Sequence, residues 1–258
     1  MKLLEFRNEK GKLVSGNEVV FPLFTQGGQT GYRLIGTGFL ILKKGVFVTA
    51  KHCLTDNSGN KLPWLMGLMA HGHMRRVDIV ILHEEVDVAV GIFEKGDYDC
   101  KECTNHRIIS LTNRTPDENE ELFHFGCNQT RFDLFKKIDD EWLELQGRIS
   151  LRGYKGRYEG FCPGDPTAPW PHHFTNSYFP SGSSGGPTVS ACGFVCGINS
   201  RSSKGFEEVP PHGRLTRVSD LLTGQLTGNI IVSGRELVKP SFYDIVIQGG
   251  GRVEGFEK

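Results

Sequence analysis

The chain has 258 residues, with 30 basic and 30 acidic side chains and therefore no net charge. This length is enough to bury one large core or two smaller ones. A nucleic acid or an anionic membrane usually requires a basic surplus on its protein partner, so the charge balance argues against both. No stretch approaches about 20 consecutive apolar residues, so no membrane span is expected.

The cysteine content and the first residues bear on the compartment. Seven cysteines cannot all pair within one chain, and an odd count favours a reducing environment. The first 18 residues carry charges where a signal peptide would carry its apolar segment. The sequence therefore predicts a cytoplasmic protein.

Short runs with a strand pattern dominate the chain, and 33 glycines and 12 prolines punctuate them. The runs either alternate in polarity or are continuous in Val, Ile and Leu, and both patterns are typical of strands. Long amphipathic helical patterns are scarce, which argues against a βαβ architecture and predicts an all-β fold. The clearest expected strands are 33–42, 46–50, 77–82, 86–93, 142–150, 186–190 and 194–199.

Two short helices are expected, one at 51–54 and one near 216–226, where a short apolar face recurs. Residues 158–176 carry four prolines and little periodicity, so they are expected to be irregular. The tail after about residue 228 has one apolar run, 244–248, and is expected either to add an edge strand or to be partly disordered.

A polar, acidic loop at 112–121 divides the chain. It predicts an N-terminal unit at 1–115, a second unit at 116–228 and a C-terminal tail at 229–258.

Three local signals follow one another in the order His–Asp–Ser. His52 ends a β-type run, Asp87 lies inside an apolar run, and Ser184 lies in a glycine-rich turn. A serine hydroxyl is a poor nucleophile that requires a base, and a histidine titrates near neutrality and can take its proton. A buried aspartate fixes the imidazole tautomer and stabilises the imidazolium. The three residues therefore predict a nucleophile, a base and an orienting acid.

The glycines around Ser184 predict an oxyanion hole. Gly182 and Gly185 allow backbone conformations that other residues resist. This freedom can direct the N–H groups of Gly182 and Ser184 at one point, where they would stabilise a developing oxyanion.

The segments TAKHC at 49–53, DVAV at 87–90 and GSSGGP at 182–187 resemble the three signature segments of trypsin-like (chymotrypsin-fold) serine peptidases. The resemblance spans about residues 30–220. It implies two six-stranded antiparallel β-barrels with a cleft between them and a short C-terminal helix. It also implies that the first barrel supplies His52 and Asp87 and that the second supplies Ser184 and the oxyanion hole. The implied activity is hydrolysis of a protein or peptide substrate through an acyl-enzyme, without metal or organic cofactor.

The segment from Ser184 to Ser200 resembles the HtrA-like and bacterial glutamyl-endopeptidase branch, which favours a bacterial-type intracellular enzyme. In that branch the segment that corresponds to Ser200–Ser202 pairs with the substrate backbone as an added strand. Ser183 stands where trypsin carries the aspartate used in zymogen activation, so activation of that type is not expected. The substrate-binding residues that the resemblance implies are Tyr178, Phe179, Asn199, Ser200, Arg201 and Ser202.

Two alternatives concern the constellation itself. Asp78 could be the acid, but its separation from His52 is short for a barrel strand to return, and Asp87 fits better. The serine also fits the G-x-S-x-G nucleophile elbow of α/β-hydrolases. That fold requires an acid and then a histidine after the serine, and only Glu207 or Glu208 with His212 could serve.

A different class is a pseudo-peptidase, or a peptidase held inactive until a regulatory protein binds. The complete set of three residues argues against a permanently inactive protein. A metal site is a further alternative. Cys100, Cys103 and His106 have a C-x₂-C-x₂-H spacing, and Cys127 or Cys162 could provide the fourth ligand. A single C-x₂-C pair is a weak signal, so free thiols and no metal are expected.

Overall fold

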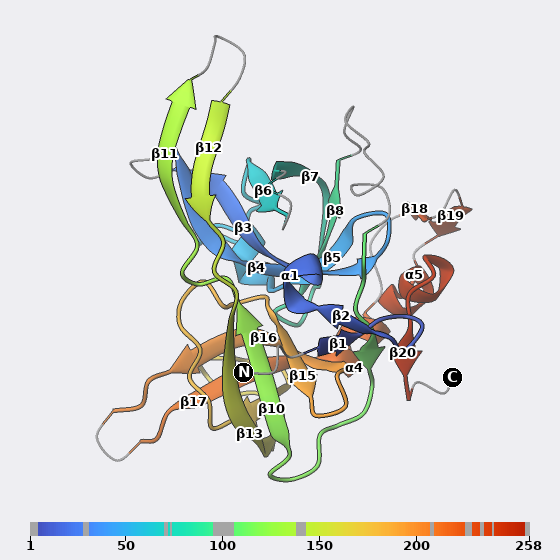
Figure 1. Cartoon of the computed structure of the whole chain (residues 1–258). Helices are drawn as coiled ribbons and strands as arrows, with labels where there is room; N and C mark the ends of the chain where they lie inside the picture. The colour runs from blue at the N-terminus through green and yellow to red at the C-terminus, as the bar shows by residue number, and fades with distance from the viewer. Residues whose placement is uncertain are drawn as a thin grey trace.

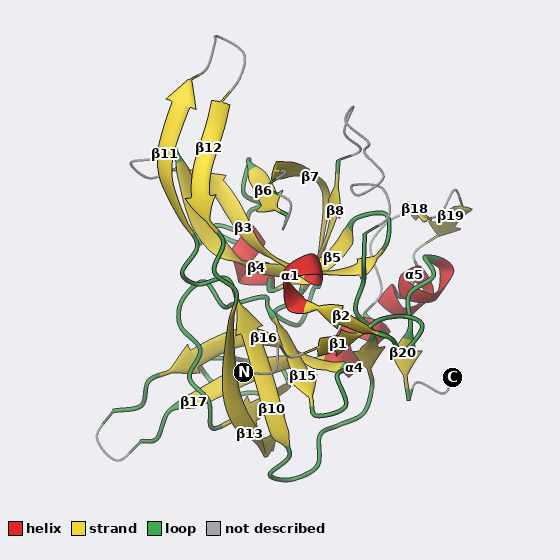
Figure 2. Ribbon diagram, in the orientation of Figure 1, coloured by secondary structure: helices red, strands yellow, loops and turns green. Residues whose placement is uncertain are grey.

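The computed structural model describes residues 5–27, 31–69, 72, 74–94, 106–137, 143–206, 209–224, 229–232, 235–238 and 240–255. Strands dominate this part of the chain and the helices are short (Figure 2). The predicted all-β class is therefore confirmed. Each of the seven strand regions expected from the sequence overlaps an observed strand.

The first barrel closes from six antiparallel strands in the order β3-β4-β5-β8-β7-β6 (Figure 1, blue to teal). Its interior is filled by aromatic rings, with Phe21, Phe47 and Phe93 at centroid separations of 4.8 to 5.2 Å. The strands are β3 (Val20–Gln26), β4 (Tyr32–Leu42), β5 (Val46–Thr49), β6 (Leu65–Leu68), β7 (Met74–Leu82) and β8 (Ala89–Phe93).

The second barrel also has six antiparallel strands, in the order β15-β10-β13-β14-β17-β16, and pairing of β15 with β16 closes it. The predicted pair of six-stranded barrels is thus confirmed. Two short strands, β9 (Leu111–Thr112) and β20 (Val253–Glu254), extend its sheet in parallel from β16. The barrel strands are β10 (Glu121–Gly126), β13 (Arg152–Cys162), β14 (His172–Thr175), β15 (Pro187–Ser190), β16 (Val195–Ser203) and β17 (His212–Arg217).

The largest buried cluster spans both barrels. It contains Phe39 and Val48 of the first barrel, Val189 and Ile198 of the second, and Phe242 from the C-terminal region. Burial of this apolar surface fixes the two barrels against each other, and loops from both therefore meet at a constant geometry.

In the described part of the chain, the remaining elements are three hairpins and four helices. The hairpin that contains residues 131–137 and 143–148 projects away from the second barrel (Figure 1, top). The hairpins pair β1 (Glu5–Arg7) with β2 (Leu13–Ser15), β11 (Arg131–Lys137) with β12 (Leu143–Arg148), and β18 (Asn229–Val232) with β19 (Arg235–Val238). The helices are α1 (Gly16–Val19), α2 (Lys51–Leu54), α4 (Val218–Thr223) and α5 (Phe242–Gln248).

Helix α2 has the predicted bounds, and α4 lies within the expected 216–226 and provides the predicted short C-terminal helix. The interpretation of 244–248 as a strand is wrong, because these residues belong to α5. Ser241 and Asp244 form a capping box at its start, and Phe242, Ile245 and Val246 are buried at helical spacing.

The expectation of an irregular 158–176 is partly wrong. Strand β13 continues to Cys162, and β14 begins at His172, so only the proline-containing connection between them is irregular. The boundary after residue 115 stays a prediction. The described chain contains no helix long and apolar enough to cross a membrane.

Candidate active site

His52 lies in the single turn of α2, directly after β5. Cys53 and Leu54 are buried and anchor this turn, while 39% of the His52 side chain remains exposed, which leaves it accessible to a ligand. The Nδ1 atom of His52 lies 2.8 Å from Asp87 Oδ2, and its backbone N–H donates to Asp87 Oδ1 at 3.0 Å. Because Nδ1–H donates to the carboxylate, the neutral imidazole carries its lone pair on Nε2.

Asp87 is buried at the point where the two barrels meet. The Ser200 hydroxyl donates to Asp87 Oδ2, and the Thr216 hydroxyl donates to the Asp87 carbonyl at 3.2 Å. Burial alone would raise the pKa of Asp87, but the hydrogen bonds from His52 and Ser200 outweigh it and lower this pKa. His52 of the first barrel and Ser200 of the second therefore together hold the Asp87 carboxylate in its charged form.

The pKa of His52 is raised by the same contact. Burial is the largest single influence and lowers this pKa, but the hydrogen bond to Asp87 and the neighbouring Cys53 together outweigh it. The result is a more basic imidazole than a free histidine provides.

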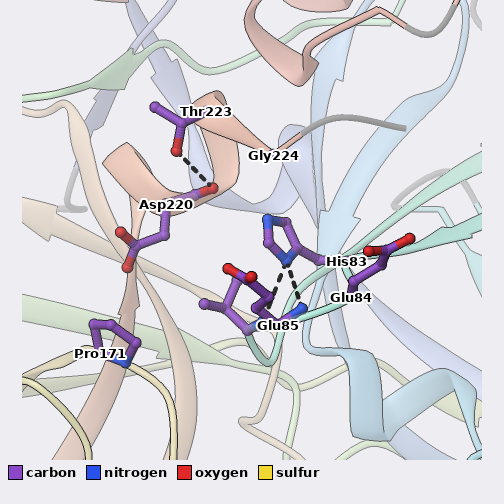
Figure 3. Close-up of a pocket in the computed structure, with 8 residues that line it drawn as sticks. His83, Glu84, Glu85, Pro171, Asp220, Thr223 and Gly224 are labelled. Carbon is purple, nitrogen blue, oxygen red and sulfur yellow. Dashed lines mark hydrogen bonds between the residues drawn. The ribbon is translucent and has the colours of Figure 1, made fainter. Parts of the chain in front are cut away.

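A bend at 84–87 carries Asp87 into position, and His83 shapes it. His83 Nδ1 accepts from the backbone N–H groups of Glu85 at 3.1 Å and Val86 at 3.2 Å (Figure 3). Lys51 Nζ donates to the His83 carbonyl at 2.7 Å and so ties the bend to α2. A polar pocket of 260 Å³ opens beside the bend, lined by His83, Glu84, Glu85, Val86, Pro171, Asp220, Thr223 and Gly224.

Ser184 lies in a loop that depends on two glycines. Gly182 has φ +91° and Gly185 has φ +83°, the left-handed region that disfavours other residues. A Cβ atom at Gly185 would also collide with the side chain of Thr49. The loop turns at Gly182, where the Ser183 N–H donates to the Pro180 carbonyl at 3.0 Å.

Thr37 and Asn199 hold the carbonyl groups of this loop. The Thr37 hydroxyl donates to Gly182 O at 2.7 Å, and the Thr37 N–H donates to Ser184 O at 2.8 Å. The Asn199 amide donates to Ser183 O at 3.3 Å. Within the described part of the chain, the N–H groups of Gly182 and Ser184 donate to no protein acceptor. Both donors thus remain available for an oxygen atom of a ligand.

The Ser184 hydroxyl donates to the carbonyl oxygen of Ser200 at 3.0 Å rather than to the imidazole of His52. Ser200 is the bulged residue of β16, since the register shifts between Asn199 and Arg201. A bulge leaves its backbone outside the ladder, and the Ser200 carbonyl can therefore accept a bond from the loop.

The structure brings His52, Asp87 and Ser184 into one chain of contacts. Ser184 bonds to Ser200, Ser200 to Asp87, and Asp87 to His52. The Sγ atom of Cys53, next to His52, also lies 3.5 Å from Ser184 O.

Three of the implied substrate-binding residues have buried side chains. Asn199 is fully buried and bonds to Phe125 O and to the hydroxyl of Thr188. Phe179 packs against His124 at 5.6 Å between ring centroids. Ser200 is also buried, against Asp87.

The other three lie closer to the surface. Arg201 is exposed, and its Nη1 atom donates to the Thr167 carbonyl at 2.7 Å. Tyr178 is half-buried with Lys204 Nζ over its ring at 5.6 Å. The hydroxyl of Ser202 donates to the Phe179 carbonyl. A ligand on the surface could contact these three side chains without any change in the buried core.

The rival residues are placed elsewhere. Asp78 is exposed on β7, and the carboxylate that binds His52 is that of Asp87. His212 Nδ1 lies 3.3 Å from the Pro210 carbonyl, and Glu207 and Glu208 lie outside the described residues.

The alternative metal set of Cys100, Cys103 and His106 stays an open alternative. Cys100 and Cys103 lie outside the described residues. His106 Nε2 lies 3.0 Å from Arg75 Nη1, and because an arginine only donates, this nitrogen accepts a hydrogen bond.

Sequence reasoning missed Thr37 and the structural use of the Asn199 side chain. A signal for Thr37 exists, since a polar residue flanked by Gly36 and Gly38 interrupts an apolar strand. No comparable signal marks the side chain of Asn199.

Two closed antiparallel barrels, with a histidine and an aspartate from one facing a serine loop from the other, define the double-barrel peptidase class of protein. Residues 36–198 match the trypsin-like peptidase domain family. The match covers more than half of the chain, and the protein therefore belongs to that family. The members of this family are classed as serine endopeptidases, which are hydrolases.

Solved structures with the same fold include two related proteases. An HtrA-type protease with a tripeptide is 14% identical, with a TM-score of 0.55 over 79% of this chain and 57% of that one. A serine endoprotease from Yersinia pestis is 18% identical, with a TM-score of 0.54 over 79% of this chain and 60% of that one. The chain therefore spans less than two thirds of either structure, and at these identities the likeness is one of fold. Comparison with curated protein sequences finds no match.

Proposed function

We propose that the protein is a serine endopeptidase that cleaves protein substrates through an acyl-enzyme on Ser184, with His52 as base and Asp87 as orienting acid. The observation that carries the proposal is the double hydrogen bond from His52 to Asp87, at 2.8 and 3.0 Å. It fixes the imidazole with Nδ1 protonated, which is the tautomer that leaves Nε2 free to take a proton.

In the first step Ser184 Oγ attacks the scissile carbonyl carbon while His52 Nε2 takes the hydroxyl proton. The carbonyl π electrons move onto the oxygen, which accepts hydrogen bonds from the Gly182 and Ser184 N–H groups. Each such donor is typically worth about 3–4 kcal/mol of transition-state stabilisation. The imidazolium then returns the proton to the leaving amine, and water hydrolyses the ester with His52 again as base. No metal or organic cofactor takes part in these steps.

The substrate is proposed to bind as an extended strand beside Ser200–Ser202. Strand β15 pairs with β16 only as far as Ile198, whereas β17 pairs along the other side to Ser203. The backbone of Asn199 still bonds to Gly185 and Gly186 of the Ser184 loop, and beyond Asn199 this edge of β16 pairs with no described strand. An unpaired edge is the feature that an added strand requires.

The bond from the Ser184 hydroxyl to Ser200 O supports a second candidate, a peptidase gated by a ligand or a regulatory protein. A substrate strand that donates an N–H to Ser200 O would compete for that carbonyl and release the hydroxyl towards His52. Apo enzymes often form their catalytic hydrogen bonds only when substrate binds. If gating operates, an extended peptide or a partner protein raises the rate at which Ser184 reacts with an organofluorophosphonate. An unchanged rate would contradict gating.

The proposed activity is tested by incubating a proteome extract with the wild-type protein or with Ser184→Ala and sequencing the new N-termini. We expect new termini only with the wild-type protein, while Ser184→Ala keeps the same melting temperature. His52→Ala and Asp87→Ala should each be severely impaired, with effects that do not add. Equal cleavage by Ser184→Ala would refute the assignment of the nucleophile.

The proposed compartment is the cytoplasm of a bacterium. Among the described residues, Cys53, Cys127, Cys162, Cys192 and Cys196 are free thiols, and a reducing compartment preserves thiols. Fractionation of cells that express the protein would test this localisation.

A further inference from the structure

A second cluster of reactive side chains lies at one end of the second barrel. Cys162 ends β13 and is the cross-strand partner of His172, which begins β14. Asp165 lies in the connection between them. The Sγ atom of Cys162, a carboxylate oxygen of Asp165 and a ring nitrogen of His172 all lie within 4.8 Å of one another. Strand pairing thus gathers three potential metal ligands.

Hydrogen bonds orient Asp165 towards His172. Its Oδ1 atom accepts from Thr167 N at 2.8 Å, Thr167 Oγ1 at 2.7 Å and Ala168 N at 2.9 Å. Its second oxygen, Oδ2, is left 3.6 Å from His172 Nε2.

His172 presents a lone pair to that carboxylate. Its side chain is fully buried, and Nδ1 lies 2.8 Å from the Trp170 carbonyl, which can only accept. Nδ1 therefore carries the proton of the neutral ring, and Nε2 carries a lone pair. Nε2 is buried without a hydrogen-bond partner. Two acceptors thus face each other across a gap that a cation would bridge.

We propose that Cys162, Asp165 and His172 bind a zinc ion, with water as the fourth ligand. Thiolate, carboxylate and imidazole are the donors that zinc prefers, at about 2.0–2.3 Å in a tetrahedral arrangement. Such a geometry places ligand atoms about 3.3–3.8 Å apart, so the cluster has to contract only modestly. The bond from Nδ1 to the Trp170 carbonyl is the outer contact that metal-bound histidines usually make.

Charge balance is compatible with a divalent cation. On binding, Cys162 loses its thiol proton to solvent, so that the thiolate and the Asp165 carboxylate together neutralise the ion. Arg214 is the one cation in contact with the described cluster, with Nη2 at 3.1 Å from Asp165 Oδ2. A carboxylate oxygen has two lone pairs and can accept from Arg214 while it binds the metal.

The bound ion would brace the loop beside the proposed substrate edge. Arg201 of β16 donates to the carbonyl of Thr167 in this loop at 2.7 Å and lies over the Trp170 ring at 5.3 Å. Zinc at Cys162, Asp165 and His172 would fix both ends of the same loop. The ion therefore has a structural role, and its binding does not depend on the proposed peptidase activity.

The test is titration of the metal-free full chain with Co²⁺, which reports a cysteine ligand through a thiolate-to-cobalt charge-transfer band, followed by displacement with Zn²⁺. We expect one Co²⁺ per chain, displaced by one Zn²⁺. Cys162→Ser should lose the band and weaken zinc binding by at least about 100-fold. Cys192→Ser, which changes an exposed cysteine elsewhere, should behave as the wild-type protein.

Asp165→Asn provides a second variant that keeps an oxygen for the Thr167 and Ala168 bonds. It should fold as the wild-type protein in EDTA and still bind Zn²⁺ at least about 10-fold more weakly. Absence of stoichiometric Co²⁺ binding by the wild-type chain would overturn the proposal. So would a band that persists in Cys162→Ser and disappears in Cys100→Ser or Cys103→Ser.

Discussion

The two barrels have the same number of strands but different interiors. The first is filled by the rings of Phe21, Phe47 and Phe93. The second encloses polar side chains, among them His124, Asn199 and Thr188. Apolar packing stabilises a barrel without regard to direction, whereas buried hydrogen bonds require particular atoms at particular places. The apolar interior of the first barrel therefore mainly stabilises the fold, and the polar interior of the second barrel holds particular backbone groups in place.

The polar interior of the second barrel has a single consistent hydrogen-bond assignment. The Thr188 hydroxyl donates to Asn199 Oδ1 at 2.7 Å, so it must accept from His124 Nδ1–H at 2.8 Å. His124 Nε2 then accepts from the Thr175 hydroxyl at 3.2 Å. Through Asn199 this network ends at the carbonyl of Ser183, next to Ser184. The network thus connects the barrel interior to the loop of the proposed nucleophile.

The largest effect is expected at Asp87, where the two barrels share one carboxylate. Asp87→Asn should lower kcat by about 10⁴-fold, because an amide cannot hold His52 in the required tautomer. The acid limb of the pH–rate profile is the fall in rate at low pH, and the raised pKa of His52 places this limb at higher pH than a free histidine would. In Asp87→Asn the acid limb of the remaining activity should therefore move to lower pH. The pKa of His52 is raised to about 10, so kinetics from pH 5 to 11 test this. The exposed Asp78→Asn should leave both the rate and the acid limb unchanged.

Phe47→Ala tests the apolar interior. Its ring is fully buried between Phe21 and Phe93, so its removal should lower the free energy of unfolding by about 3–5 kcal/mol. Phe206→Ala, at a side chain that is 76% exposed, should change it by less than about 0.5 kcal/mol. Urea unfolding measures both. Equal effects of the two substitutions would show that the first barrel is not stabilised as described.

Asn199→Leu tests the polar interior. The change leaves the carbonyl groups of Phe125 and Ser183 without their buried donor, which should lower the free energy of unfolding by about 2 kcal/mol. The loss of kcat should nevertheless exceed that of Phe47→Ala, because the Ser184 loop loses a support. Asn176→Ala, which removes an exposed amide that accepts from Arg157 N, is the matched control. A larger loss of kcat in Phe47→Ala would contradict the division of roles.

The most gradual effect concerns pH. Burial lowers the pKa of His124 to about 3 and that of His173 to about 4. Both are protonated near pH 6.5 in the unfolded chain, so the free energy of unfolding should fall as pH drops below 6.5, until each group protonates in the folded state as well. His173→Phe should reduce the slope below pH 6.5 by about 1.4 kcal/mol per pH unit. An unchanged slope would mean that His173 takes up its proton equally in both states.

The sequence predicted the strands and the three residues of the proposed catalytic set, because these are local signals. Each strand run, the turn of helix after β5 and the glycine-rich loop is formed by residues that are neighbours in the sequence. The pair of six-stranded barrels, in contrast, was implied by the resemblance to trypsin-like peptidases. The approach of Asp87 to His52 also followed from the resemblance, since the family pattern carries the long-range pairing that a single sequence lacks.

Other features depend on the register between paired strands, which cannot be predicted from a single sequence. The bulge at Ser200 directs its hydroxyl to Asp87 and its carbonyl to Ser184, and a shift by one residue would exchange the inner and outer faces of β16. Asn199 lies inside the barrel for the same reason. Cys162, Asp165 and His172 have no recognisable ligand spacing and meet only because β13 pairs with β14.

The central claim is that the junction of the two barrels forms an active serine nucleophile. The most direct measurement is covalent labelling of the full chain by an organofluorophosphonate, with the modified residue located by mass spectrometry. We predict one adduct per chain on Ser184, none in Ser184→Ala and a greatly reduced rate in His52→Ala. A wild-type chain that stays unlabelled with and without an extended peptide, or that is labelled on another residue, would contradict the account.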